Sequence, residues 1–303
     1  MLPRPCRACA SITPRRSISW RGGSSLPSRS IFPTLVLASI CLAPVAARGD
    51  TPPGSDLDYE PALSIAATTL WLTTEFPLKR SLAPDSCRWC DRGGDGKSGL
   101  NGLDASMRGR FRWGDPRSAA KISDALLFVG VPATSVASIW IAADSDGRGD
   151  ETGENALLMF EAAAVSAALN QAAKFTLARQ RPYAHYAPAG TPPTSDDNLS
   201  FYSGHAAVTF TTSVAAGTIA SMRGYSGANV VWIPGVVLAS FTSYLRLGCD
   251  RHYFTDVLAG VVIGTGVGIA VPRLLHHGDD DAAAADAPSA LRARPMVSFR
   301  WAW

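Results

Sequence analysis

Six apolar stretches, separated by polar or Gly/Pro-rich segments, constrain the fold of this 303-residue chain more than any other feature. They cover roughly residues 59–75, 123–143, 155–179, 203–222, 229–247 and 255–275, and Ala, Leu and Val dominate them. None alternates apolar and polar residues as a half-buried strand does. The pattern predicts an all-α fold, a helical bundle of about six helices.

Composition excludes two broad classes of protein. The chain is 47% hydrophobic and 17% charged, so it can form a core and carries too little charge for disorder. The net charge is only +3, and no basic run is interleaved with aromatic residues. We therefore expect no nucleic-acid partner.

The first 47 residues resemble a secretory signal. Six arginines precede an apolar run over 31–47, which ends in the small residues Val45-Ala46-Ala47. This order predicts export with cleavage, and an uncleaved membrane anchor is the alternative. Because the basic region is long, the true start codon could lie further along the chain.

The rest of the chain divides into three parts. Residues 48–118 hold an N-terminal helix and a cysteine-containing loop, residues 119–277 a helical core, and residues 278–303 a low-complexity C-terminal tail rich in Asp and Ala. Cys87-Arg-Trp-Cys90 lacks the second pair of a structural zinc site. In an oxidising compartment a disulfide is favoured, with a redox-active pair as the alternative.

Three polar clusters stand at ends of the apolar stretches: 174–182, 201–205 and 245–256. If the helix ends converge, the clusters bring together a set of residues suited to binding a tetrahedral oxyanion. Its members are Lys174, Arg181, Ser203, Gly204, His205, Arg246, His252 and Asp256.

The first cluster contributes two cations. Lys174 and Arg181 are seven residues apart, so we expect both on one face near the end of the third helix, which Pro182 then stops. Alone, such a pair commonly only complements the helix dipole.

The second cluster contributes a helix N-terminus. Ser203 directly precedes an apolar run and can act as the N-cap, with the amides of Ser203, Gly204 and His205 pointing outward. Such an end favours an anion, and glycine allows its close approach. An isolated His205 would more often be a core or capping residue.

The third cluster carries the chemistry. His252 and Asp256 are four residues apart, so if they open the sixth helix the carboxylate can accept a hydrogen bond from one ring nitrogen. The other nitrogen is then free as a nucleophile. Arg246 can offer a planar fork to phosphate oxygens. The alternative is an ordinary surface His-Asp pair with a nearby arginine.

Together, Lys174-x6-Arg181-Pro182, Ser203-Gly204-His205 and Arg246-x5-His252-x3-Asp256 resemble the signature of the phosphatidic-acid-phosphatase type 2 superfamily. That superfamily includes bacterial acid phosphatases, lipid phosphate phosphatases and vanadium haloperoxidases. The motifs span about 83 residues and agree in order and spacing, which identifies 119–277 as a phosphatidic-acid-phosphatase-like core. Tyr202 and Leu245 depart from the usual proline and serine, and they could alter loop rigidity and substrate choice.

The resemblance implies a phosphoric ester hydrolase acting on phosphate monoesters or lipid phosphates and pyrophosphates. His252 would attack phosphorus and form a phosphohistidine, with Asp256 orienting it, and His205 would protonate the leaving oxygen. The phosphate oxygens would be held by Lys174, Arg181, Arg246 and the amides near Ser203 and Gly204. No metal or other cofactor is expected.

Two alternatives remain. A vanadium-dependent haloperoxidase would hold vanadate in the same pocket with His252 as ligand. A non-catalytic phosphate- or lipid-binding protein would keep the cations without needing His252. The complete set of His205, His252 and Asp256 favours an enzyme.

Placement relative to a membrane is ambiguous in the sequence. Six apolar segments match the count of integral lipid phosphatases, but the loop 77–119 expected beside the site is rich in Lys and Arg, which favours a cytoplasmic site and opposes the export signal. Lys121, Asp124, Glu161 and Asn170 interrupt the apolar runs, and a charge at a lipid-facing centre costs about 2.5 to 3.5 kcal/mol. We expect an exported, membrane-associated helical domain in the periplasm or cell envelope, with an integral protein whose site lies outside the cytoplasm as the alternative.

Overall fold

The computed structural model describes residues 59–93 and 98–275, and most of these residues are helical. Within these two ranges there is no β-strand, only two isolated bridges that pair Trp89 with Arg179 and Arg92 with Ser98. The all-α prediction is confirmed. The predicted signal over 1–47 and the tail over 278–303 lie outside the described residues, and the division into parts stays a prediction.

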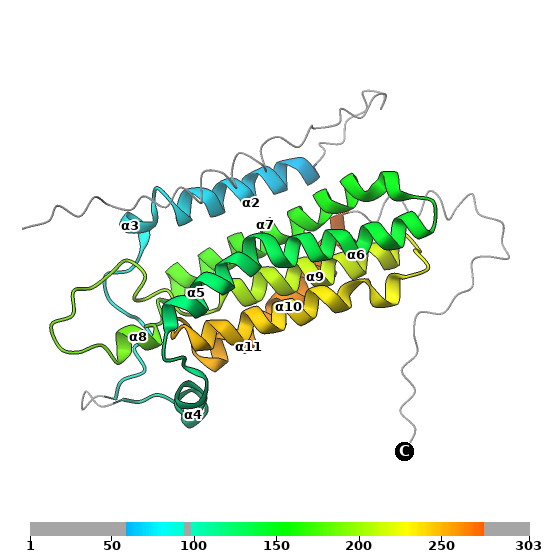
Figure 1. Cartoon of the computed structure of the whole chain (residues 1–303). Helices are drawn as coiled ribbons and strands as arrows, with labels where there is room; N and C mark the ends of the chain where they lie inside the picture. The colour runs from blue at the N-terminus through cyan, green and yellow to red at the C-terminus, as the bar shows by residue number, and fades with distance from the viewer. Residues whose placement is uncertain (1–58, 94–97, 276–303) are drawn as a thin grey trace, which may run out of the picture. The chain divides into compact units, whose positions relative to one another are not determined.

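Each of the six predicted stretches forms a long helical segment (Figure 1). The second segment is a composite, because a π-helical turn joins α5 to α6 without a break. The long segments are α2 (Tyr59–Glu75), α5 (Pro116–Ala125) with η1 (Leu126–Gly130) and α6 (Val131–Ser145), α7 (Thr152–Leu177), α9 (Gly204–Met222), α10 (Ala228–Gly248) and α11 (Phe254–Leu275). The short helices are α3 (Lys79–Leu82), α4 (Gly102–Phe111), η2 (Gly149–Glu151) and α8 (Pro182–His185).

Local capping explains two helix boundaries that the apolar pattern missed. Helix α5 begins at Pro116 rather than near Ser123, because the Asp115 side chain accepts a hydrogen bond from the backbone of Arg117 and Pro116 occupies the first turn. Helix α4 was not predicted. Its N-cap is Asn101, whose side chain accepts from the amide of Asp104.

The end of α7 corrects the expected arrangement of the first two cations. Ala178 adopts a left-handed conformation with φ of 47°, so α7 ends at Leu177 and the chain turns away. Pro182 does not stop this helix but starts α8, for which Arg181 is the N-cap. Lys174 and Arg181 therefore do not share a helix face, and that prediction is wrong.

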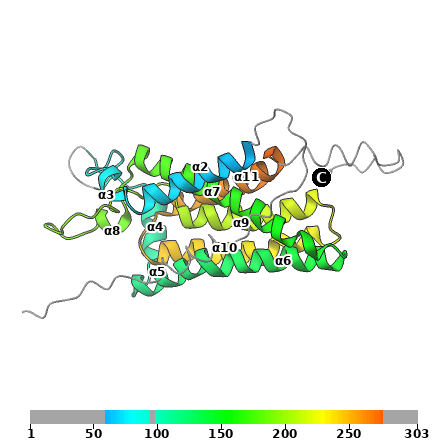
Figure 2. The same cartoon turned by 90° about the horizontal axis from the view of Figure 1, so that it is seen from above.

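Helix α9 lies at the centre of the bundle, in contact with α6, α7, α10 and α11 (Figure 2). Several of its hydroxyls bond within the helix, as where Thr209 and Ser213 donate to carbonyls one turn earlier, whereas Thr211 donates to the carbonyl of Gly264 on α11. At the end remote from the polar clusters, side chains such as Ile219 and Met159 form the main apolar core.

Three glycines on α11 bring this helix against α9. A β-carbon at Gly260, Gly264 or Gly268 would collide with the backbone carbonyls of Ser203, Ala207 and Thr211, respectively. The close approach fixes the start of α9 beside the start of α11. There the amide of Ser203 donates to the carbonyl of Asp256 at 3.0 Å.

The polar clusters converge at one end of the bundle. Helices α7 and α10 end there, α9 and α11 begin there, and the short helices α3, α4 and α8 gather around this end (Figure 1). The convergence of helix ends that the clusters predicted follows from this up-and-down order.

Candidate active site

His252 lies in the turn before α11 and is only 3% exposed. Its Nδ1 donates to the carbonyl of Ser200 at 2.7 Å, which places a proton on Nδ1 and leaves the lone pair on Nε2. Burial, together with the positive charges of Arg246 and Arg181, holds the pKa of His252 well below its usual range. The imidazole is therefore neutral and able to act as a nucleophile.

Asp256 supports this ring indirectly. Its Oδ2 is 4.0 Å from Nδ1 of His252, too far for the predicted direct hydrogen bond. The expectation was wrong because α11 begins at Phe254, so His252 is not one helical turn away on the same face. Asp256 instead accepts from the hydroxyl of Ser200 at 2.6 Å, and Ser200 presents its carbonyl to the ring.

His205, in the first turn of α9, has a carboxylate partner from another helix. Its Nε2–H donates to Oδ1 of Asp124 at 2.7 Å, and Nη1 of Arg246 lies 3.5 Å from the same nitrogen. Asp124 belongs to α5, where the sequence suggested only an unfavourable charge in an apolar run. Burial and the positive charge of Arg246 lower the pKa of His205 to about 3, and the Asp124 carboxylate opposes this shift because it stabilises the protonated imidazole.

The guanidinium groups of Arg181 and Arg246 are both buried at the site. Arg246 donates through Nη1 to the hydroxyl of Ser123 at 2.9 Å, and Arg181 lies 3.9 Å from Asp196. The Nε–H groups of both arginines have no hydrogen-bond partner within the described part of the chain. Buried, unsatisfied cationic donors favour a ligand that offers several acceptor oxygens.

Gly204 permits the ammonium group of Lys174 to approach the start of α9. A β-carbon at Gly204 would lie 2.6 Å from Oδ1 of Asn170 and 3.4 Å from Nζ of Lys174. Asn170 also donates to the carbonyl of Tyr202 at 2.8 Å and so holds the loop that enters α9. The positive charges of Arg181 and Arg246 are close enough to act on the ammonium group of Lys174. The structure therefore brings the three predicted cations together.

Ser203 is the N-cap of α9, as predicted, and its hydroxyl accepts from the amide of Ala206 at 3.4 Å. Its own amide was expected to face outward but is bonded to Asp256. Of the three predicted amide donors, those of Gly204 and His205 are left for an anion, since first-turn amides have no acceptor within their own helix.

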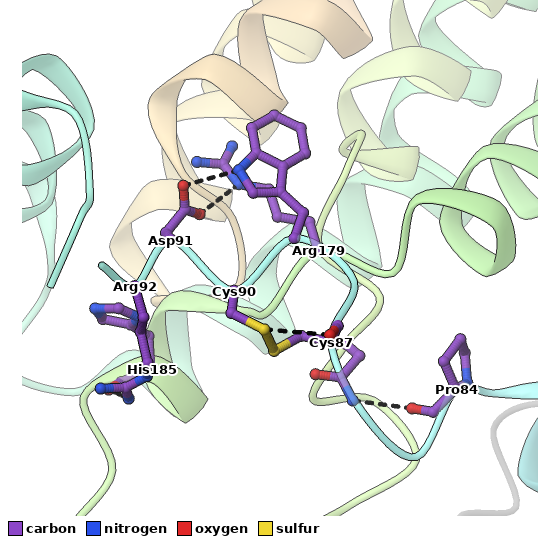
Figure 3. Close-up of a disulfide and its surroundings, with 9 residues drawn as sticks. Pro84, Cys87, Cys90, Asp91, Arg92, Arg179 and His185 are labelled. Carbon is purple, nitrogen blue, oxygen red and sulfur yellow. Dashed lines mark hydrogen bonds and ion pairs between the residues drawn. A yellow bond between two sulfur atoms is a disulfide. The ribbon is translucent and has the colours of Figure 1, made fainter. Parts of the chain in front are cut away.

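The cysteine-containing loop lies at the same end of the bundle. Cys87 and Cys90 form a disulfide, which confirms that prediction, and Figure 3 shows the bridge next to Asp91 and Arg179. The loop is joined to the chain after α7, because Arg88 donates to the carbonyl of Ala178 and Gln180 donates to that of Trp89.

Several residues of the site could not be found from the motifs. Each of them is a single polar residue without a spacing pattern, and some precede the motifs by many residues. They are Ser123, Asp124, Asn170, Arg179 and Ser200. The interruptions of the apolar runs at Asp124 and Asn170 were the available signal.

Among residues 59–93 and 98–275, no group of three or more His, Cys, Asp or Glu side chains is placed to hold a metal ion. The expectation that no metal is needed remains a prediction. The donor set around His252 consists of cations and amide groups, a chemistry that suits an anion.

Comparison with protein families gives one match. Residues 155–278 match the family model described as the PAP2 superfamily, and this span contains every residue predicted for the site. Ser123, Asp124 and the disulfide loop lie outside it. No curated protein matches the chain.

Proposed function

We propose that the protein is a phosphatase of the PAP2 superfamily, whose family model residues 155–278 match, and that it hydrolyses phosphate monoesters or lipid phosphates and pyrophosphates through a phosphohistidine. One observation carries the proposal. A buried, neutral His252, with its proton held on Nδ1 by Ser200, lies among the cations Lys174, Arg181 and Arg246.

In the first step, Nε2 of His252 attacks phosphorus as the bond to the ester oxygen breaks. His205 gives its Nε2 proton to the departing oxygen, so the alcohol leaves neutral. Asp124 stabilises the charged form of His205 that this step requires. The phosphoryl group is then bonded to His252, and its oxygens are held by the three cations and the amides at the start of α9.

In the second step, water attacks the phosphohistidine. His205, now neutral, accepts a proton from that water as the phosphorus–nitrogen bond breaks. Inorganic phosphate leaves, and both histidines return to their starting protonation states. In this scheme, the charge that develops on the phosphoryl oxygens is neutralised by side chains already in place.

We further propose that the bundle is embedded in a membrane. In the part of the chain that the structure describes, four helical stretches are long and apolar enough to cross a bilayer: Pro116–Ser145, Gly149–Leu177, Ala228–Gly248 and Phe254–Leu274. Large apolar side chains are exposed along these helices, and an outer surface of this kind suits lipid. Examples are Val129, Ile141, Leu157, Val237 and Val262.

Two of the four polar residues that argued against embedding, Glu161 and Asn170, are buried in the folded chain. Glu161 is buried and accepts from Ser64, Asn170 is buried against the loop before α9, and Asp124 contacts His205. Lys121 and Asp124 are the exposed members of this group of four, and Asp124 is paired with His205. Glu161 and Asn170 are enclosed by protein instead of facing lipid.

The disulfide supports an active site outside the cytoplasm, because such bridges persist in oxidising compartments. The basic residues of the loop 77–119 suggested the opposite orientation. Several of them have structural partners, however: Lys79 pairs with Asp196, Arg88 caps α7, and Arg108 forms a two-pronged pair with Asp250. These basic residues thus have structural roles that do not depend on which side of the membrane the loop faces.

The test is phosphate release by the purified chain in detergent with a chelator present. Suitable substrates are p-nitrophenyl phosphate, phosphatidic acid, phosphatidylglycerol phosphate and undecaprenyl pyrophosphate. We expect release from at least one substrate, loss with His252→Ala, and retention with the exposed control Arg80→Ala. No release by folded protein would overturn the hydrolase proposal, and halide peroxidation with added vanadate would then identify the alternative.

A further inference from the structure

Arg179 lies between the two cations of the first motif but faces a different set of partners. Its side chain is 0% exposed, and its guanidinium donates to three carboxylates. Nε donates to Asp91 at 2.9 Å, Nη2 to Asp104 at 2.9 Å and Nη1 to Asp256 at 2.6 Å. The rings of Trp89 and Tyr253 lie over the guanidinium at 4.2 and 4.3 Å.

These contacts reach the nucleophile through Ser200, which Arg179 holds from two directions. The carbonyl of Arg179 accepts from the amide of Ser200 at 3.0 Å, and its side chain fixes Asp256, which accepts from the Ser200 hydroxyl. The carbonyl of Ser200 in turn accepts a hydrogen bond from Nδ1–H of His252. Two hydrogen bonds thus separate the Asp256 carboxylate from the ring.

The charge arrangement makes Arg179 difficult to replace. Asp104 and Asp256 are fully buried, and Asp91 is nearly so. One guanidinium with donors in a fixed planar fork can serve all three carboxylates, whereas an ammonium group acts as a single compact charge. Without Arg179, buried carboxylates would face one another unpaired.

The third carboxylate comes from the disulfide loop, outside the segment that matches the family. Asp91 follows Cys90 directly and accepts from Nε1 of Trp89 at 2.9 Å, and Figure 3 shows its carboxylate directed at Arg179. The bridge between Cys87 and Cys90 therefore restrains both Trp89 and Asp91. The loop forms the outer part of the surroundings of Arg179.

We propose that Arg179 is a positioning residue for the nucleophile: it fixes Asp256 and Ser200 and so sets the Nδ1–H tautomer of His252, and the disulfide-closed loop 87–91 completes its support. The inference rests on the proposed function, in which His252 attacks through Nε2. Arg179 contacts no reacting atom in this scheme. Its effect is on the rate of the chemical step and not on phosphate binding.

The first experiment compares Arg179→Gln and Arg179→Lys with Arg88→Gln. The control removes a cation at the same end of α7 that bonds only to the carbonyls of Phe175 and Thr176 among the side-chain contacts described. We expect kcat to fall on the order of 10²-fold in both Arg179 variants, as small misplacements of a reacting group do. Inhibition by inorganic phosphate should stay within about twofold, because the oxyanion cations remain.

The second experiment does not depend on turnover. In the full chain labelled with ¹⁵N-histidine, the His252 resonances, assigned with His252→Ala, should report a proton on Nδ1. Arg179→Gln should lose this single tautomer, and Arg88→Gln should keep it. Unchanged kcat and an unchanged tautomer in folded Arg179→Gln would overturn the inference. Absence of activity in the wild type would instead sink the proposed function, while the tautomer still decides this inference.

A third comparison covers the case in which Arg179→Gln does not fold. Asp91→Asn removes only the outer carboxylate, and Asp85→Asn changes an exposed residue two positions before the disulfide-closed loop. We expect Asp91→Asn, and reduction of the disulfide, to lower kcat several-fold without weakening phosphate inhibition. Equal kcat for Asp91→Asn and Asp85→Asn would contradict the role given to the loop.

Discussion

In the proposed mechanism, two histidines at one site must meet opposite demands, and each has different surroundings. His252 must be neutral to attack phosphorus, and it is buried beside Arg246 and Arg181 with its proton fixed by a carbonyl. His205 must be charged to release a proton. Burial and Arg246 lower its pKa to about 3, and the carboxylate of Asp124 at 2.7 Å opposes that shift. In this proposal the acid and the nucleophile differ in their direct partners, a carboxylate for His205 and a backbone carbonyl for His252.

The role of Asp124 predicts a dependence on the leaving group. Asp124→Asn should lower kcat roughly 10- to 100-fold for alkyl and lipid phosphates, within the range that general acid catalysis contributes. It should change p-nitrophenyl phosphate hydrolysis little, because p-nitrophenolate leaves without a proton. The control is Lys121→Gln, one turn earlier on α5. Equal losses on both classes of substrate would contradict an acid-supporting role.

The environment of His252 predicts the pH dependence. A histidine whose pKa is lowered by burial and by nearby cations gains its proton only well below pH 6.5, so its lone pair is available throughout the neutral range. The acidic decline of kcat/KM that belongs to His252 should therefore lie below pH 6.5. Arg246→Gln removes one of these cations and should move that decline upward. A wild-type decline at or above pH 6.5, traced to His252, would oppose this assignment.

At the scale of elements, the contact between α9 and α11 positions the N-terminus of α9. Gly264→Ala introduces a methyl group against the backbone of Ala207, and overpacking of this kind costs about 1 to 3 kcal/mol. We expect a lower unfolding temperature in detergent and a reduced kcat. Gly266→Ala is the matched control, because a β-carbon there would meet no heavy atom within 4 Å. Equal stability of the two variants would show that the close approach is unimportant.

The six long helices could be predicted because their apolar character persists over many residues. The end of α7 could not, because the left-handed position that ends it is occupied by Ala178 and not by a glycine. The spacing of seven between Lys174 and Arg181 therefore suggested one continuous helix. Helix α4 lacks an apolar pattern, and only its Asn101 cap marks it.

The convergence of the three polar clusters could be predicted because their motifs stand at helix ends. The partners of the residues in these clusters could not. Asp124 precedes His205 by 81 residues, and Asp91 precedes Arg179 by 88, so only the fold brings each pair together. The spacing of His252 and Asp256 indicated their association but gave the wrong contact, since Ser200 lies between them.

For the whole molecule, the proposed orientation predicts which side of the membrane the disulfide faces. Intact cells treated with an impermeant reductant and then an impermeant maleimide should be labelled at Cys87 and Cys90. A variant with serine at both positions supplies the control. Cys249 is buried and should not react. Labelling that appears only after the membrane is permeabilised would place the active-site end in the cytoplasm.

The central claim is that His252 becomes phosphorylated during turnover. Its most direct test is rapid mixing with a ³²P-labelled substrate, an alkaline quench and mass-spectrometric location of the label. The account predicts an acid-labile, alkali-stable phosphoryl group on His252, absent from His252→Ala and discharged by water on further incubation. Label on another residue, or full turnover without any covalent phosphoenzyme, would contradict it.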